Sequence, residues 1–156
     1  MPERFLYLTT IGRVSGQPRT IEIWFVEHDG AFYVGTLTTF PVQVGAARIY
    51  KITPDGNLTV LAPHLTAILA LAFDQQGQLY ALQTSDIARP YLIANAGDVV
   101  RVDPNTEQGQ IIATGLTFPT GMTFGPDGML YISNNGFGFR AAGRGHIVRL
   151  SVPPGS

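Results

Sequence analysis

Residues 61–82 read LAPHLTAILALAFDQQGQLYAL, and residues 112–133 read IATGLTFPTGMTFGPDGMLYIS. The two stretches align without a gap at a spacing of 51 residues. The aligned pairs include Leu65 with Leu116, Phe73 with Phe124, Gly77 with Gly128, Leu79 with Leu130 and Tyr80 with Tyr131. Upstream, RIYKITPDG from Arg48 matches VVRVDPNTE from Val99, and IVRLSVP from Ile147 begins a third copy. A period of about 50 residues indicates a stack of equivalent structural units.

Each unit predicts four short strands. Two alternating stretches flank the turn Pro54–Asn57 and predict a hairpin, and two more flank turns with glycine at Gly77 and Gly128. No amphipathic helix of about ten residues interrupts the repeat. The sequence predicts an all-β fold: a partial β-propeller of about two to three four-stranded antiparallel blades over residues 30–152, preceded by an N-terminal β-hairpin over 1–29 and followed by a tail over 153–156.

Closure of the ring needs more blades than this chain supplies. A closed propeller has about four blades or more, since an open stack leaves two apolar faces in water. We therefore expect a homo-oligomer that closes the propeller. A truncated product with exposed end blades is the alternative that the residues leave open.

Composition excludes several classes of partner. The chain carries 10 basic and 11 acidic side chains, so we expect no nucleic acid and no anionic membrane surface as partner. No apolar run reaches the roughly 20 residues of a membrane-spanning helix. The start, MPERFLYLTT, lacks a secretory signal, which makes the cytoplasm the default expectation. Cysteine is absent, and this excludes disulfides and thiolate chemistry.

Residues 30–152 resemble a known family of propellers. The stretches YVGTLTTFPVQVGAARIYKITPDG and GLTFPTGMTFGPDGMLYISNNGFG resemble the ScyD/ScyE-type proteins and, more distantly, the gluconolactonase and NHL-type six-bladed propellers. The resemblance implies a propeller-type binding or scaffold protein for a small molecule or a protein partner. Family members are about twice this length, so the chain matches their C-terminal half, and they are commonly exported.

The resemblance to the lactonases raises the question of whether this chain has a metal site. They bind a divalent cation such as calcium through an asparagine in a PNG turn and an aspartate after the next strand. The corresponding positions here are Thr120 and Asn134, and one repeat earlier Leu69 and Gln83. These side chains bring no carboxylate, so we expect no metal and read Asn134 and Asn135 as capping a turn.

Loops at one end of a propeller converge on its axis. If a ligand site exists, the turn 117–120 and the loop 134–140 are the best candidates. The ligand-binding candidates are Thr120, Asn134 and Asn135.

The first 29 residues lie outside the repeat. FLYLTTIGRVSGQPRTIEIWFVEHDG predicts a hairpin with a basic turn, and it resembles the deazaflavin-dependent nitroreductase family. That resemblance would place Arg13, Ser15, Gly16 and Arg19 near phosphate or carboxylate groups of a deazaflavin cofactor. The remaining barrel strands of that family are missing, so we expect a hairpin that packs on or extends the first blade.

No catalytic constellation is present in the sequence. His28, His64 and His146 lack partners at zinc-ligand spacing, and there is no nucleophile elbow, phosphate loop or dinucleotide fingerprint. The aromatic side chains Trp24, Tyr33, Tyr80 and Tyr131 predict strand packing. We therefore expect a non-catalytic binding or scaffold protein. The alternative is an enzyme, either a deazaflavin-dependent reductase or a gluconolactonase-like hydrolase.

Overall fold

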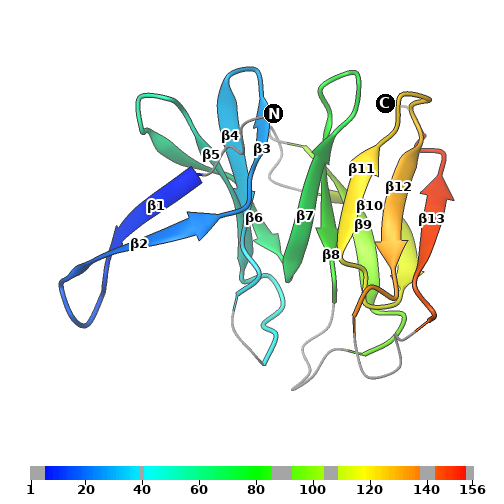
Figure 1. The fold of residues 1–156 in the computed structure, drawn as a ribbon, viewed down its shortest axis with the longest axis horizontal. Helices are drawn as coiled ribbons and strands as arrows, with labels where there is room; N and C mark the ends of the chain where they lie inside the picture. Colours follow the sequence, from blue (N-terminus) through cyan, green and yellow to red (C-terminus); the bar gives the residue numbers. More distant parts are fainter. Residues whose placement is uncertain (1–5, 39–40, 86–92, 104–108, 138–142, 154–156) are drawn as a thin grey trace.

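The computed structural model describes residues 6–38, 41–85, 93–103, 109–137 and 143–153. These residues form thirteen strands and no helix, in four antiparallel sheets (Figure 1). A two-stranded sheet contains β1 (Leu6–Ile11) and β2 (Pro18–Ile23). The prediction of an all-β fold with an N-terminal hairpin is confirmed.

Three further sheets form the blades. The first blade contains β3 (Val26–His28), β4 (Ala31–Gly35), β5 (Ala47–Ile52) and β6 (Leu58–Leu65). The second blade contains β7 (Ile68–Phe73), β8 (Leu79–Gln83), β9 (Gly97–Val102) and β10 (Gly109–Leu116). The third blade contains β11 (Gly121–Phe124), β12 (Leu130–Asn134) and β13 (His146–Leu150).

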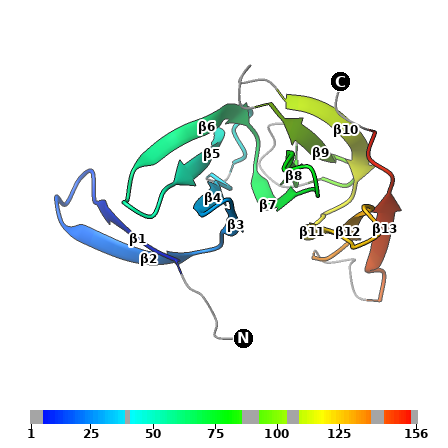
Figure 2. The same ribbon diagram turned by 90° about the horizontal axis from the view of Figure 1, so that it is seen from above.

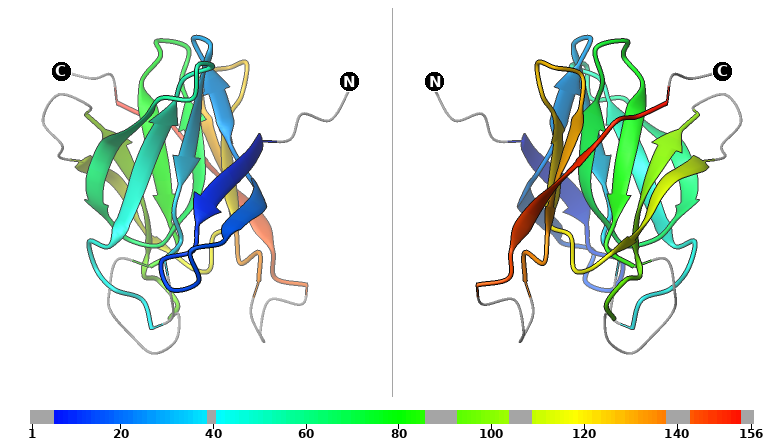
Figure 3. Two further views of the ribbon diagram at one scale, coloured as in Figure 1. Left: turned by 90° about the vertical axis from the view of Figure 1, so that its left-hand side faces the viewer. Right: turned by 90° about the vertical axis from the view of Figure 1, so that its right-hand side faces the viewer.

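The blades stand in a fan. Viewed from above, their first strands β3, β7 and β11 lie on the inner side of the curve, and β6 and β10 lie on the outer side (Figure 2). Seen from its two ends, the fan is bounded by the β1–β2 hairpin beside the first blade and by β13 on the third (Figure 3). The hairpin shares no hydrogen-bonded ladder with the first blade, so it does not extend that sheet.

Hydrophobic residues fill the two spaces between blades. One cluster joins the first and second blades and includes Tyr33, Ile49, Leu71 and Val100. The other joins the second and third blades and includes Leu82, Val99, Leu130 and Ile132. Every residue of β8 and β9 is therefore buried, whereas burial largely alternates along β12 of the third blade.

The repeat is real, but its phase differs from the prediction. The sequence grouped the hairpin after Arg48 with the two strands that follow it. In the structure that hairpin is β5–β6 of the first blade, while the next two strands, β7 and β8, begin the second. The stretch from Gly30, whose pattern is that of the fourth strand of a unit, is accordingly the second strand of a blade. A sequence period defines the length of a repeating unit but not where the unit starts. Which consecutive strands share a sheet is decided by their hydrogen bonding, and β6 and β7 belong to different sheets.

Val26–His28 also joins the first blade, through the pairs of Val26 with Tyr33 and His28 with Ala31. The hairpin proper ends at Ile23, and two residues separate it from β3.

Candidate functional site

The inner side of the fan contains an apolar cavity of about 300 Å³. It is lined by the first strands of all three blades and by the segment that leads into β3. The lining includes Trp24, Tyr33, Ile68, Leu69, Thr120 and Met122. No charged side chain lines it among the described residues. The cavity therefore suits an uncharged ligand, with the Thr120 hydroxyl as a polar group at its edge.

Trp24 does not pack in a sheet as predicted. It lies between β2 and β3 and is 96% exposed. The tyrosine predictions hold for Tyr33 and Tyr80, which are buried. The strand-packing prediction failed for Trp24 because the hairpin forms a separate sheet, so no neighbouring strand covers the indole. An exposed indole at a cavity is an aromatic surface on which a ligand can stack.

Thr120 lies at this cavity, and its hydroxyl is 3.1 Å from the Ser133 hydroxyl. Asn134 follows Ser133 in the sequence and is buried. The Asn134 Oδ1 accepts a hydrogen bond from the Thr117 amide at 2.8 Å, and its Nδ2 is 3.2 Å from His146 Nε2. Both ends of the Asn134 amide are therefore occupied by the protein.

Asn135 has a positive φ of 55°. Its backbone N–H donates to the Thr117 carbonyl at 2.8 Å. Asparagine tolerates this left-handed conformation better than most residues, which explains its place in the turn. The two asparagines thus shape the loop that holds Thr120, and their role as ligand-binding residues stays a prediction. The part of the candidate loop at 138–140 lies outside the described residues.

The same loop geometry recurs one blade earlier. The Gln83 side chain accepts from the Thr66 amide, as Asn134 does from Thr117, and the Gln83 Nε2 donates to Asp98 Oδ1 at 2.7 Å. Asp98 is a carboxylate only 1% exposed, and it was not among the site residues predicted from the sequence. The sequence signal that could have found Asp98 is its position near the start of a strand and not in a turn.

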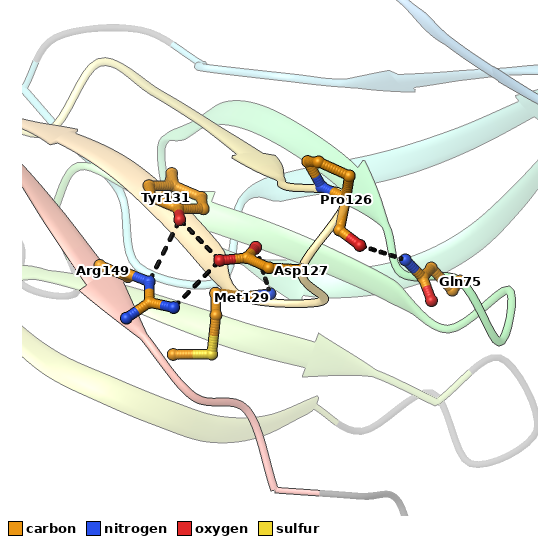
Figure 4. Close-up of polar contacts among 6 residues, drawn as sticks. All are labelled: Gln75, Pro126, Asp127, Met129, Tyr131 and Arg149. Carbon is orange, nitrogen blue, oxygen red and sulfur yellow. Dashed lines mark hydrogen bonds and ion pairs between the residues drawn. The ribbon is translucent and has the colours of Figure 1, made fainter.

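A second polar cluster joins Tyr131, Asp127 and Arg149 on the third blade (Figure 4). Tyr131 donates from its hydroxyl to Asp127 Oδ2 at 2.8 Å, and Arg149 Nη2 lies 3.0 Å from the same oxygen. Arg149 Nε also donates to the Tyr131 hydroxyl at 3.1 Å. The hydrogen bond from Tyr131 lowers the pKa of Asp127, and the bond to Asp127 raises the pKa of Arg149.

An equivalent cluster is buried between the second and third blades. Tyr80 donates to Asp74 Oδ2 at 3.1 Å and accepts from Arg101 Nε at 3.3 Å. Burial raises the pKa of Tyr80. Arg101 is 9% exposed and also donates to the Pro153 carbonyl and to Gln110 Oε1.

This buried cluster borders a further cavity of about 570 Å³, between the second and third blades. Its polar walls include Asp74 and Gln78. Gln78 donates to the Val102 carbonyl at 2.5 Å, and Asp74 accepts from Tyr80, so these groups serve the packing of strands.

The residues implied by the nitroreductase resemblance lie in the hairpin and not at the inner cavity. Ser15 and Gly16 form the turn, with Gly16 N–H donating to the Gly12 carbonyl at 2.8 Å, and all four predicted residues are exposed. None of Arg13, Ser15, Gly16 and Arg19 lines either cavity described above. Their role in cofactor binding stays a prediction.

Within the described ranges, no group of three or more His, Asp or Glu side chains is placed to hold a metal ion. Helices long and apolar enough to cross a membrane are likewise absent from the part of the chain that the structure describes.

The comparison with solved structures decides the fold. A luciferin-regenerating enzyme matches 96% of this chain and 52% of its own, with a TM-score of 0.53 and 17% identity. This chain has a propeller-type fold. A putative gluconolactonase is similar over 68% of this chain and 38% of its own, with 16% identity and a TM-score of 0.46.

The chain thus spans about half the length of the luciferin-regenerating enzyme, or less for the gluconolactonase. At this level of identity the likeness concerns the fold alone. No family model matches the chain, and no curated protein matches it.

Proposed function

We propose that this chain is a propeller-type binding protein of the ScyD/ScyE kind, which takes a small uncharged molecule at its inner cavity. The observation that supports this most is the apolar cavity of about 300 Å³ where the first strands of three blades meet. Its volume lies at the lower end of the range for small-molecule sites, about 300–1,000 Å³.

The lining suggests the chemistry of the ligand. Aliphatic walls from Ile68, Leu69 and Met122 favour an apolar body, and the exposed Trp24 indole favours a planar ring. Thr120 supplies a hydroxyl for one polar substituent.

The only tryptophan of the chain is also its direct reporter of binding. Titration with N-phenyl-1-naphthylamine, an uncharged aromatic probe, is expected to give saturable energy transfer from Trp24 to the probe. A Cβ added at Gly121 meets nothing within 4 Å, so Gly121→Phe places a ring in the cavity without a backbone clash. We expect it to weaken probe binding by about tenfold or more, equivalent to about 1.4 kcal/mol.

The matched control is Gly145→Phe, because an added Cβ at Gly145 makes only an ordinary contact, 3.7 Å from the Asn135 carbonyl oxygen. This variant is expected to bind the probe as the unaltered chain does. Equal binding by the two variants, or binding that does not saturate, would refute the site.

A gluconolactonase-like hydrolase is the second candidate function. It is favoured by the position of Thr120 at the cavity and by the similar fold of an enzyme, the luciferin-regenerating enzyme. Against it, the Asn134 amide is occupied and no carboxylate is among the described lining residues. Lactone hydrolysis that a chelator abolishes, and that Thr120→Ala reduces, would favour the hydrolase over the binding protein.

A deazaflavin-dependent reductase rests on the hairpin alone. Arg13 and Arg19 are exposed there, and guanidinium groups suit a phosphate-bearing cofactor. Fluorescence titration with a deazaflavin tests this function. Saturable binding that is lost in both Arg13→Ala and Arg19→Ala would support it, and no saturation at high micromolar cofactor would end it.

A further inference from the structure

Each blade presents one tyrosine that pairs directly across the sheet with a basic residue. The cross-strand pairs are Tyr33 with Lys51, Tyr80 with Arg101, and Tyr131 with Arg149. In the first blade the Lys51 ammonium lies 5.9 Å from the Tyr33 ring centre. In the second, the Arg101 guanidinium lies 5.7 Å from the Tyr80 ring. The pair therefore marks one face of every blade.

In the first two blades, the next blade covers this face. Phe73, at the end of β7, packs edge-on against Tyr33 with ring centres 4.8 Å apart. Phe124, at the end of β11, packs on Tyr80 at 5.0 Å. The two tyrosines are 7% and 2% exposed. The face with Tyr131 and Arg149 has the same composition, and no further blade follows it among the described residues.

The register of the first strands shows which residue belongs opposite. Tyr33 pairs with Val26, Tyr80 with Ala72 and Tyr131 with Thr123, so the residue that follows in each strand is equivalent. Those equivalent residues are Glu27, Phe73 and Phe124. Phe73 and Phe124 reach back to the preceding blade. Side chains alternate along a strand, so Glu27 points the same way, away from the second blade.

The face of the first blade around Glu27 has the composition of a packing face. Glu27 pairs with Phe32, Phe32 pairs with Ile52, and Ile52 pairs with Leu58, which is 48% exposed. A parallel row ends at Val60, which is 50% exposed. The apolar row of the first blade matches the kind of face that the next blade covers in the first two blades. At the corresponding place the third blade carries Tyr131 and Arg149, and Arg149 pairs with Asp127 through Nη2, so Glu27 of a partner would meet the remaining N–H groups of the guanidinium.

We propose that the third blade packs against the first blade of a second copy of this chain, with Glu27 of one copy facing Arg149 and Tyr131 of the other. Two such contacts, related by a two-fold axis, close a ring of two chains. This inference does not depend on the proposed ligand.

The β1–β2 hairpin lies on the side of the first blade that faces away from the second blade (Figures 2 and 3). Its Ile21 is 51% exposed and Tyr7 is 61% exposed, so the chain itself covers little of the hairpin. In the dimer the hairpin would lie against the third blade of the partner. The alternative is that the hairpin of the same chain covers this face. The chain would then be a monomer in solution, with half the mass of the dimer.

The test is the mass in solution of the full chain by analytical ultracentrifugation. We expect a dimer of the 16.8 kDa chain. Glu27→Arg is expected to raise the dimer dissociation constant by about tenfold or more, because two arginines then face each other. Arg149→Glu is expected to do the same, and the double variant to restore the dimer.

Arg144→Glu is the matched control, because it makes the same charge change at an exposed position before β13. It is expected to leave the dimer intact. A monomer at high micromolar concentration would overturn the proposal and would favour the hairpin as the cover of the face. So would a larger open assembly, or a dimer that neither charge change weakens. Probe binding at Gly121 is measured separately, so either proposal can fail alone.

Discussion

The guanidinium of Arg149 donates from Nε to the hydroxyl of Tyr131 at 3.1 Å, and Arg101 makes the same bond to Tyr80 at 3.3 Å one blade earlier. The two pairs share residue chemistry and strand register but differ in burial. Arg101 is 9% exposed, whereas the side chain of Arg149 is 56% exposed. The third blade covers the pair of Arg101 and Tyr80. We therefore expect Arg101 to contribute more to stability than Arg149.

Arg101→Ala is expected to lower the free energy of unfolding by about 1.5–3 kcal/mol, because it removes charged hydrogen bonds to Tyr80 and the Pro153 carbonyl in a buried site. Arg149→Ala is the matched control and is expected to cost less, since water replaces its partners. Urea unfolding of both variants at one protein concentration checks this. Equal losses would contradict the role assigned to burial.

Tyr80 is expected to make the fold sensitive to alkali. Burial raises the pKa of Tyr80 above its ordinary value of 10.0. The folded chain thus keeps its proton at a pH where the unfolded chain releases it. This contribution is full below the unfolded pKa and is lost as the pH rises through the folded pKa. Urea unfolding between about pH 8 and pH 11 is expected to show a steeper decline for the unaltered protein than for Tyr80→Phe. Equal declines for the two proteins would exclude Tyr80 as the source of the alkaline sensitivity.

Asn134→Ala is expected to lower the free energy of unfolding by about 1–3 kcal/mol, because the Thr117 amide loses its acceptor in a partly buried loop. Asn135→Gly is the contrasting change. At a φ of 55° glycine is unstrained, so stability is expected to stay within about 0.5 kcal/mol. Thermal unfolding distinguishes the two variants. A larger loss for Asn135→Gly would show that its side chain, and not its backbone, matters.

Gly35→Ala tests the packing of the first blade on the second. An added Cβ would lie 2.5 Å from Ile68 Cγ2, and we expect such overpacking to cost about 1–3 kcal/mol. Gly121→Ala, where an added Cβ meets nothing within 4 Å, is the control with the same change and a small effect. Urea midpoints that move equally would indicate that Ile68 gives way without cost.

Several features of the fold could be predicted from the residues. The 51-residue repeat, the alternation along the strands and the glycine turns indicated antiparallel blades, because these signals are local. The hairpin over the first residues was also local, since its two strands and turn are consecutive. The phase of the blades was not predictable, because β6 and β7 follow each other in sequence while belonging to different sheets.

The candidate site shows the same division. Thr120 was named as a ligand-binding candidate from its position in a turn at one end of the blades; it lines the inner cavity, and its role in binding stays a prediction. Trp24 was missed, because its exposure depends on the hairpin standing apart from the first blade. Asp98 was missed as well, since its burial requires the strands of the second blade to be covered on both faces.

By itself the sequence determined the repeating strand pattern of this chain, because alternation and turn chemistry act between residues that are close along the backbone. Tertiary structure alone decided which of three equivalent tyrosines are buried. Tyr33 and Tyr80 are covered by phenylalanines about 40 residues further along the chain, whereas no further blade among the described residues covers Tyr131. The physical reason is that burial depends on the neighbouring sheet, and equivalent strand positions meet different neighbours in the first two blades and in the third.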